Sequence, residues 1–309
     1  MRITDEVLLK WSAIGSTDLS KYGYDFVKNR LNNLNFIKSN FEDFEIYLQG
    51  SYANHTNIRR ESDVDIVLQY NGIFRYDDSK LDAVTKQKRN NAFVRAKMTF
   101  EEYKRKIFNE LYQEAIKYKA ISDVKYKAKS IKVSLQNPNI DVDIVPCFLY
   151  KNYWTFSEDD PLNKTHYKHG IALDDTDTGN LIINYPKIHK ENGEDKSNRT
   201  NRIYKATIRY IKKIKSLLVE KGIIDEKLAP SYFIENLLFN VPDNLFDKVS
   251  YLKTFDNILS FLSNTSRYET FLCQHKQWKL FGNSSTQWNK EDAENFVEKL
   301  IEVHQGEYL

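Results

Sequence analysis

The sequence predicts an α+β protein with two lobes, a mixed sheet followed by a helical lobe. Two segments, Asp63–Leu68 and Ile140–Pro146, alternate between acidic and apolar residues, as half-buried β-strands do. From Arg202 onwards, apolar residues recur instead at the three- and four-residue spacing of amphipathic helices. With 309 residues, the chain is long enough for two closely packed lobes.

The composition indicates a soluble protein from a reducing compartment. Lys and Arg number 46 against 43 Asp and Glu, and this net charge of +3 does not indicate a nucleic-acid-binding tail. The two cysteines, Cys147 and Cys273, form no zinc-binding pattern. Because there is no signal peptide and no run of 18 apolar residues, we expect a cytoplasmic protein without a membrane partner.

The first predicted strand leads into a tight turn. Residues 5–40 have helical spacing, and Phe44–Leu48 then alternates as a strand that ends at Gln49-Gly50-Ser51. Glycine allows the backbone to approach a phosphate closely, and Ser51 can offer both its amide and its hydroxyl. Gly-Ser is also a common turn dipeptide, so its position just before the first acidic strand gives it meaning.

Two pairs of carboxylates carry the predicted chemistry. Asp63 and Asp65 lie two residues apart on a strand, so both project from one face while their apolar neighbours face the core. Asp141 and Asp143 repeat this arrangement on a later strand. Either pair alone is equally well explained as a solvated strand face. Together with the preceding Gly-Ser and the Ile-Val-Pro after Asp143, they favour a divalent-metal site, since a cation relieves the repulsion between them.

At these positions the sequence resembles the DNA polymerase beta-like nucleotidyltransferases, whose signature is Gly-Ser, Asp-x-Asp and a later Asp before two apolar residues and Pro. It is most similar to the oligoadenylate synthase and cyclic GMP-AMP synthase branch, and in particular to the bacterial CD-NTases, which make cyclic oligonucleotides in anti-phage defence. The resemblance implies a polymerase beta-like mixed sheet. Residues 1–190 would form the catalytic lobe and 191–309 a helical lobe that completes the nucleotide site, with the N-terminal helices packing on the helical lobe.

The resemblance also implies the roles of the site residues. Asp63, Asp65 and Asp143 would bind two Mg²⁺ ions, for which Mn²⁺ can substitute, with Asp143 rather than Asp141 as the third ligand. A ribose hydroxyl of one NTP would attack the α-phosphorus of another and release pyrophosphate, and a second reaction would close the ring. The turn residues would bind the nucleotide: Gln49, Gly50 and Ser51.

Two predicted helices of the second lobe carry further candidates. Lys205 and Lys212 lie two turns apart on the helix Arg202–Lys221 and resemble lysines that reach the donor triphosphate, although a solvated basic face explains them equally well. On the next helix, Ser231 matches a residue near the phosphates and Tyr232 one that stacks on the donor base. Core packing is the alternative for Tyr232.

The remaining segments divide into regular elements and irregular connections. Val124–Leu135 is predicted to form two short strands whose lysines guard a sheet edge, a reading that we favour over contact with nucleic acid. Three further segments have the spacing of helices: Phe100–Tyr118, Leu245–Ser263 and Glu291–Val303, the last capped by Asn289. Three segments without a clear period are expected to be irregular: Asn71–Asn91, Tyr150–Asp177 and the connector Asn184–Thr200.

We expect the partners to be NTP substrates, an effector that binds the product and a regulatory protein, and we do not expect a nucleic-acid activator. Two alternatives remain open. The same carboxylates would serve nucleotidyl transfer to RNA, protein or a small molecule, because only the acceptor pocket differs. The other alternative is a non-catalytic nucleotide-binding module, against which the three retained carboxylates argue.

Overall fold

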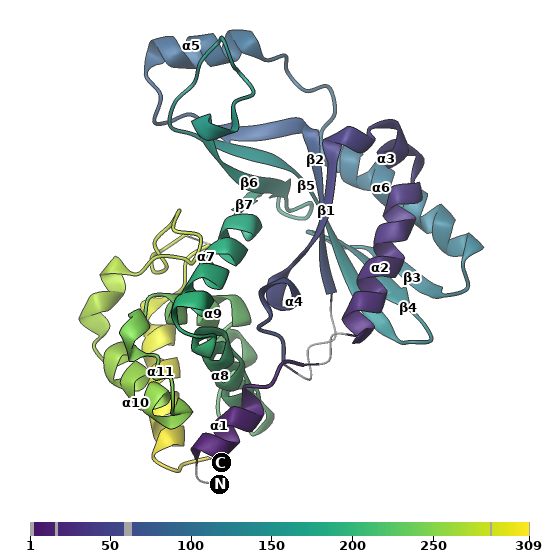
Figure 1. Ribbon diagram of the computed structural model, residues 1–309. Helices are drawn as coiled ribbons and strands as arrows, with labels where there is room; N and C mark the ends of the chain where they lie inside the picture. Colours follow the sequence, from purple (N-terminus) through teal and green to yellow (C-terminus); the bar gives the residue numbers. More distant parts are fainter. Residues whose placement is uncertain (1–2, 16–17, 59–63, 285, 309) are drawn as a thin grey trace. The chain divides into compact units, whose positions relative to one another are not determined.

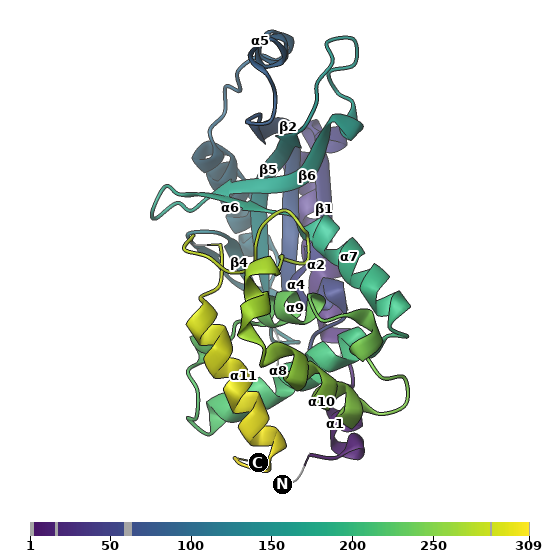
Figure 2. The ribbon, with the colours of Figure 1, turned by 90° about the vertical axis from the view of Figure 1, so that its left-hand side faces the viewer.

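The structure is a computed structural model, and it describes residues 3–15, 18–58, 64–284 and 286–308. The chain forms two compact units (Figure 1, Figure 2). The sheet unit comprises Thr17–Tyr52 and Ser62–Lys187. The helical unit comprises Met1–Ser16, Ala53–Glu61 and Ile188–Leu309.

A seven-stranded mixed sheet forms the frame of the sheet unit. The strand order is β1-β2-β5-β4-β3, with β6 pairing β5 and β7 pairing β6. Among the described strands, β2 and β5 pair in parallel and the other neighbours pair antiparallel, so the predicted α+β fold with a mixed sheet is confirmed. The strands are β1 (Phe44–Gln49), β2 (Val64–Asp77), β3 (Ile121–Tyr126), β4 (Ile131–Leu135), β5 (Ile140–Tyr153), β6 (Tyr167–Asp174) and β7 (Leu181–Asn184).

Helices α2 and α6 cover one face of this sheet (Figure 1). We expected α2 to pack with the helical lobe, but its apolar stripe, which includes Val27 and Leu31, is buried in the core of the sheet. Thr99 begins α6 with a capping box, in which its side chain and that of Glu102 satisfy each other's backbone amides. The helices of this unit are α2 (Asp18–Asn33), α3 (Asn35–Ser39), the first three residues of α4 (Gly50–Asn54), α5 (Ala83–Ala92) and α6 (Phe100–Lys117).

The segments that we expected to be irregular are largely regular, which corrects those predictions. Strand β2 continues to Asp77 because its second half still pairs with β5, and Asp82 then caps α5 by accepting a bond of 2.9 Å from the Thr85 amide. Strands β5 and β6 extend into Tyr150–Asp177, and helix α7 (Pro186–Arg199) replaces the expected connector. These segments are rich in polar residues, so they lack the apolar periodicity by which we assigned the others.

The helical unit is held together by one apolar core that includes the buried rings of Tyr204, Tyr210, Phe255 and Phe296. Its helices are α1 (Asp5–Trp11), most of α7, α8 (Ile203–Glu220), α9 (Ser231–Phe239), α10 (Tyr251–Leu262) and α11 (Lys290–His304). The predicted cap of α11 is confirmed, since Asn289 accepts a bond of 2.7 Å from the Glu291 amide. The described residues include five 3₁₀ turns: η1 (Phe41–Asp43), η2 (Lys164–His166), η3 (Glu226–Leu228), η4 (Asp243–Leu245) and η5 (Thr265–Thr270). No helix in the described part of the chain is long and apolar enough to cross a bilayer.

Candidate active site

Three oxygen-bearing side chains lie in one row across neighbouring strands of the sheet unit. In the β1–β2 pair Gln49 lies opposite Asp65, and in the β2–β5 pair Asp65 lies opposite Asp143. Directly opposed residues of paired strands place their side chains on the same face, so this row presents one amide and two carboxylates together. We call it the Gln49–Asp65–Asp143 row. The predicted ligand Asp63 lies outside the described residues.

Gly50 follows the row directly, and its position requires glycine for two reasons. Its φ of +70° lies in the left-handed region, which residues with a Cβ atom rarely adopt. A Cβ atom built at Gly50 would lie 2.6 Å from Oδ2 of Asp65. The turn that we predicted from Gly50 and Ser51 therefore brings the backbone into close contact with one carboxylate of the row.

The two acidic residues of β5 have different partners. Asp143 accepts hydrogen bonds at Oδ1 from the Ser130 hydroxyl, at 3.0 Å, and from the Lys127 ammonium, at 3.2 Å. Asp141 pairs with Lys132 and accepts a bond of 2.6 Å from Ser134. Partial burial raises the pKa of Asp141, but the bonds from Lys132 and Ser134 lower it on balance. Because Asp143, and not Asp141, lies opposite Asp65, the register favours Asp143 as the functional carboxylate.

The donor atoms of the row fit a hard divalent cation. Mg²⁺ prefers carboxylate and carbonyl oxygens, and the row offers both kinds. The side-chain oxygen of Gln49 is buried and has no hydrogen-bond partner in the described structure. Among the described residues no group of three or more His, Cys, Asp and Glu side chains is arranged to hold a metal ion, so the described donor set is these two carboxylates and one amide.

In the helical unit, the predicted residue Lys212 belongs to a buried network centred on Glu235 of α9. The Lys212 side chain is only 2 % exposed, and its ammonium lies 3.0 Å from Glu235. Glu235 also accepts hydrogen bonds from Asn54 (3.1 Å), Thr56 and His189 (3.2 Å). We call these residues the Glu235 network. Burial raises the pKa of Glu235, but the charge of Lys212 and the bonds from His189 and Thr56 lower it well below its usual range.

The other predicted residues of the helical unit lie around this network. Tyr232 stacks on His189, with ring centres 5.3 Å apart and an angle of 21° between the rings. Lys205 lies in the first turn of α8, and its ammonium pairs with Glu194 of α7. Ser231 is half-buried at the first position of α9. Three predicted residues of this unit, Lys205, Lys212 and Tyr232, therefore have protein partners in the structure.

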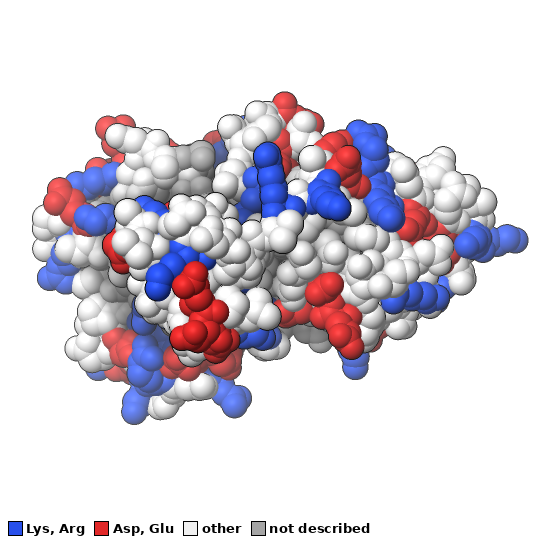
Figure 3. Space-filling model, turned by 90° about the horizontal axis from the view of Figure 1, so that it is seen from above, with Lys and Arg blue, Asp and Glu red and all other residues white. Residues whose placement is uncertain are grey.

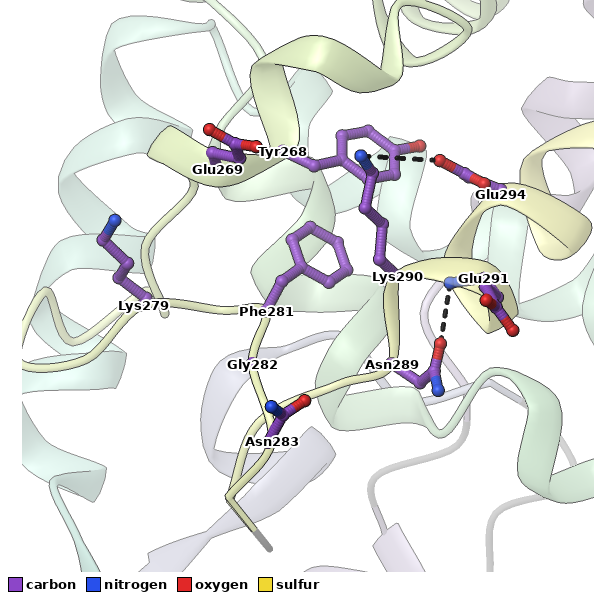
Figure 4. Close-up of a pocket in the computed structure, with 10 residues that line it drawn as sticks. All are labelled: Tyr268, Glu269, Lys279, Phe281, Gly282, Asn283, Asn289, Lys290, Glu291 and Glu294. Atoms are coloured by element: carbon purple, nitrogen blue, oxygen red, sulfur yellow. Dashed lines mark hydrogen bonds and ion pairs between the residues drawn. The ribbon is translucent and has the colours of Figure 1, made fainter.

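Two pockets lie away from all of the predicted site residues. One, of about 730 Å³, lies in the sheet unit between the second half of β2 and the segment that links α5 to α6. The other, of about 650 Å³, lies in the helical unit (Figure 4). It has mixed charge, and Lys290 lies 3.9 Å from Glu294 within it. Its lining residues are Tyr268, Glu269, Lys279, Phe281, Gly282, Asn283, Asn289, Lys290, Glu291 and Glu294.

Basic and acidic side chains are intermixed on the face that Figure 3 shows. This agrees with the composition, in which 46 basic residues are balanced by 43 acidic ones.

Three residues of these sites were not predicted from the sequence: Glu235, Lys127 and Ser130. Glu235 is the one charged residue in the helical run Phe233–Phe239, and a lone charge in such a run needs a buried partner. That signal could have identified Glu235 but not its partners, which come from three segments: residues 54–56, α7 and α8. No local pattern marks Lys127 and Ser130, because they reach Asp143 only through the pairing of β4 with β5.

Two family models match separate parts of the chain. Residues 32–167 match a nucleotidyltransferase domain. Residues 191–305 match the C-terminal helical domain of cGAS/DncV-like nucleotidyltransferases. The two matches correspond to the order of lobes that the sequence predicts.

Curated relatives match over nearly the whole chain. Cyclic nucleotide synthase CdnE01 of Staphylococcus haemolyticus is 40% identical over 96% of this chain and 97% of its own. Cyclic UMP-AMP synthase of Rhodothermus marinus is 33% identical over 99% of both chains.

Solved structures agree with these matches. A structure of the Rhodothermus marinus CdnE c-UMP-AMP synthase with Apcpp and Upnpp superposes with a TM-score of 0.83 at 32% identity, over 99% of this chain and 97% of the other. The CdnE cyclic dinucleotide synthase of Elizabethkingia meningoseptica, with GTP and Apcpp, gives a TM-score of 0.76 at 28% identity, over 99% of this chain and 100% of the other.

Proposed function

Because this chain belongs to the cGAS/DncV-like nucleotidyltransferases, we propose that the Gln49–Asp65–Asp143 row forms its catalytic centre. The enzyme joins nucleoside triphosphates into a cyclic oligonucleotide and releases pyrophosphate. The observation that carries the assignment of the centre is the register that sets Asp65 opposite Asp143, beside a glycine whose Cβ would crowd Asp65.

Asp65 and Asp143 are the described residues that would hold Mg²⁺, together with Asp63 as the resemblance implies. When bound, Mg²⁺ lowers the pKa of the acceptor ribose hydroxyl and offsets the negative charge of the triphosphate. A hydrogen bond from the Ser130 hydroxyl holds the Asp143 carboxylate in place. Gln49 adds a neutral oxygen on the other side of Asp65. Gly50 permits close approach of the nucleotide, and Ser51 would donate to a phosphate oxygen.

The helical unit would contribute the remaining nucleotide contacts. Tyr232 would stack on a base, since a ring held by His189 is already oriented before the nucleotide arrives. Lys205 would exchange Glu194 for a phosphate, with Ser231 nearby as a hydroxyl donor. Lys212 is 2 % exposed, paired with Glu235 and bonded to the Thr56 carbonyl. We therefore assign it a structural role, in which it holds the segment that contains Asn54 and Thr56.

We further propose that the product is a second messenger in anti-phage defence, bound by a separate effector protein. The names of the relatives support this proposal only as far as cyclic nucleotide synthesis. Those names include cyclic UMP-AMP and cyclic dipurine products, so base choice differs within the family.

The test is incubation of the purified protein with all four labelled NTPs and Mg²⁺ or Mn²⁺, beside Asp65→Asn and Asp143→Asn. After phosphatase treatment, products are separated by chromatography, and reactions lacking one NTP each identify the bases used. We expect phosphatase-resistant products from the wild-type protein and none from either variant. Label that appears only on added RNA, protein or a small molecule would overturn cyclic nucleotide synthesis, and activity that persists in both variants would overturn the assigned centre.

A further inference from the structure

The turn between β3 and β4 carries two side chains that contact Asp143. The turn is closed by a bond of 3.0 Å from the Lys127 amide to the Ser130 carbonyl. The side chains of both residues then reach Oδ1 of Asp143, at 3.2 Å from Lys127 and 3.0 Å from Ser130. A charged and a neutral donor therefore share one oxygen of a carboxylate that we assign to catalysis.

A buried lysine of α6 also holds the backbone of this turn. Lys104 is 0 % exposed, and its ammonium donates to the carbonyls of Lys127 and Ala128, the latter at 2.8 Å. Thr176 donates to the same Ala128 carbonyl through its amide and its hydroxyl, both at 3.0 Å. A buried ammonium is stable only where oxygen atoms solvate it, so Lys104 fixes the backbone of this turn. The contact with Asp143 is therefore built into the fold.

The electrostatics give the two donors different consequences. Asp65 and Asp143 are opposed like charges, and Lys127 supplies a positive charge to one of them. A divalent cation bound by Asp143 would compete with that ammonium for the same oxygens and would be repelled by it. The Ser130 hydroxyl is neutral, so it can stay bonded to Asp143 whether or not a cation is present.

We propose that Lys127 is an internal counter-ion that holds Asp143 until the catalytic cation takes its place, while Ser130 keeps the carboxylate in position throughout. This proposal rests on the assignment of Asp143 to the catalytic centre. Lys127 thereby sets the cation concentration at which the enzyme works, and both residues are positioning residues.

The two neighbours of one carboxylate are thus expected to have opposite effects on cation binding. Loss of the Lys127 charge should tighten Mn²⁺ binding about two- to fivefold, which corresponds to the usual strength of a partly exposed ion pair. Loss of the Ser130 hydroxyl should weaken it about threefold. Because a partly exposed charge is screened by ions, the effect of Lys127 should shrink at 1 M salt, whereas that of Ser130 should persist.

The experiment measures Mn²⁺ binding by electron paramagnetic resonance in the presence of a non-cleavable ATP analogue with a methylene α,β-bridge. Lys127→Met and Ser130→Ala are compared with Lys125→Met, a charge-matched control. Lys125 lies on β3 and pairs with Asp123 at 2.9 Å, so its loss should leave Mn²⁺ binding within about twofold. As a kinetic readout, the Mg²⁺ concentration for half-maximal activity should fall in Lys127→Met and rise in Ser130→Ala.

Unchanged or weaker Mn²⁺ binding in Lys127→Met, or an equal gain in Lys125→Met, would overturn the counter-ion role. Thermal unfolding shows whether each variant is folded, and if Lys127→Met is not, Lys127→Gln keeps a donor without the charge and is measured instead. Asp143→Asn separates the two proposals. If it leaves Mn²⁺ binding and activity intact, the assigned centre fails, whereas if it abolishes both and Lys127→Met shows no gain, only the counter-ion role fails.

Discussion

The two units of the molecule use charged side chains in contrasting ways. In the sheet unit, Asp143 keeps 18 % of its side chain exposed. Its Oδ1 accepts hydrogen bonds from Lys127 and Ser130, in the turn between β3 and β4. In the helical unit, Glu235 and Lys212 are 5 % and 2 % exposed and bind each other and nearby groups of the same unit. A carboxylate at a strand surface can accept an ion from solution, whereas a buried pair is already compensated and mainly holds segments together. Charge alone therefore does not identify a site residue.

The largest effect should come from the sheet unit. Asp143→Asn should lower kcat by roughly a thousandfold or more, because losing the proposed metal ligand would remove several kcal/mol of transition-state stabilisation. Asp141→Asn is the matched control, since Asp141 is bonded to Lys132 and Ser134 and should change kcat less than about threefold. Pyrophosphate release measures both. A large loss in Asp141→Asn with activity retained in Asp143→Asn would reverse the assignment.

In the helical unit the corresponding change should act on stability. Glu235→Gln should lower the free energy of unfolding by about 3–5 kcal/mol, because it leaves Lys212 buried without its counter-charge. Urea denaturation measures this loss. Glu194→Gln is the control: Glu194 pairs with the largely buried Lys205 but keeps half of its own side chain exposed, so its loss should cost at most about 1 kcal/mol. Equal losses in the two variants would remove the contrast between a buried and a half-exposed carboxylate.

The same variant gives a pH dependence with a definite sign. The pKa of Glu235 is lowered in the folded state, so its ionised form stabilises the protein above the ordinary pKa of about 4.5, and this contribution is lost as pH falls. The stability difference between wild type and Glu235→Gln should therefore narrow below about pH 4.5. A difference that stays constant down to pH 3 would contradict the ionised buried pair.

A smaller effect should follow from crowding at the row. Gly50→Ala places a Cβ atom 2.6 Å from Asp65, so the carboxylate must move, and we expect kcat to fall about 10- to 100-fold. Gly222→Ala is the matched control, because Gly222 has nearly the same φ, +69°, and nothing within 4 Å of its added Cβ. Both variants should lose about 1 kcal/mol of stability from backbone strain. Equal activity in the two would show that Asp65 tolerates displacement.

The smallest effect should be on nucleotide affinity. Tyr232→Ala should raise the KM for nucleotide about tenfold, which is the usual strength of one ring stacked on a base, while Tyr232→Phe should stay within about twofold. Steady-state pyrophosphate release at varied NTP gives both values. If Tyr232→Ala lowers the melting temperature and leaves KM unchanged, the ring belongs to the core of the helical unit.

Local patterns in the sequence predicted much of the sheet unit. The alternation around Asp65 and Asp143 has a period of two, so it shows directly which side chains leave the core, and the burial of Val64, Ile66, Val142 and Ile144 agrees. The extension of β2 to Asp77 was missed because its second half is stabilised by pairing with β5 rather than by an apolar face of its own.

The partners of the helical unit could not be predicted in the same way. Periodicity gave the stripe of α8 that contains Lys205 and Lys212, but it does not tell whether a basic stripe meets solvent, phosphate or protein. The Glu235 network joins Asn54, Thr56 and His189 to α8 and α9, over separations of 23 to 181 residues. Contacts over such separations have no local signature.

The pairing of β2 with β5 contains an irregularity that bears on how such a chain can change over generations. Tyr70 pairs with Phe148 and Phe74 with Leu149, so the residues between Tyr70 and Phe74 have no partner on β5. Residues can be gained or lost beyond this bulge, in the arm that ends in α5, while the pairing of Asp65 with Asp143 stays in step. On the other side of the bulge, a shift of one residue would replace Asp65 by a core residue and abolish the row. Insertions and deletions should therefore occur mainly between Phe74 and the end of α5 at Ala92. The first half of β2, which contains Asp65, should be inherited without them.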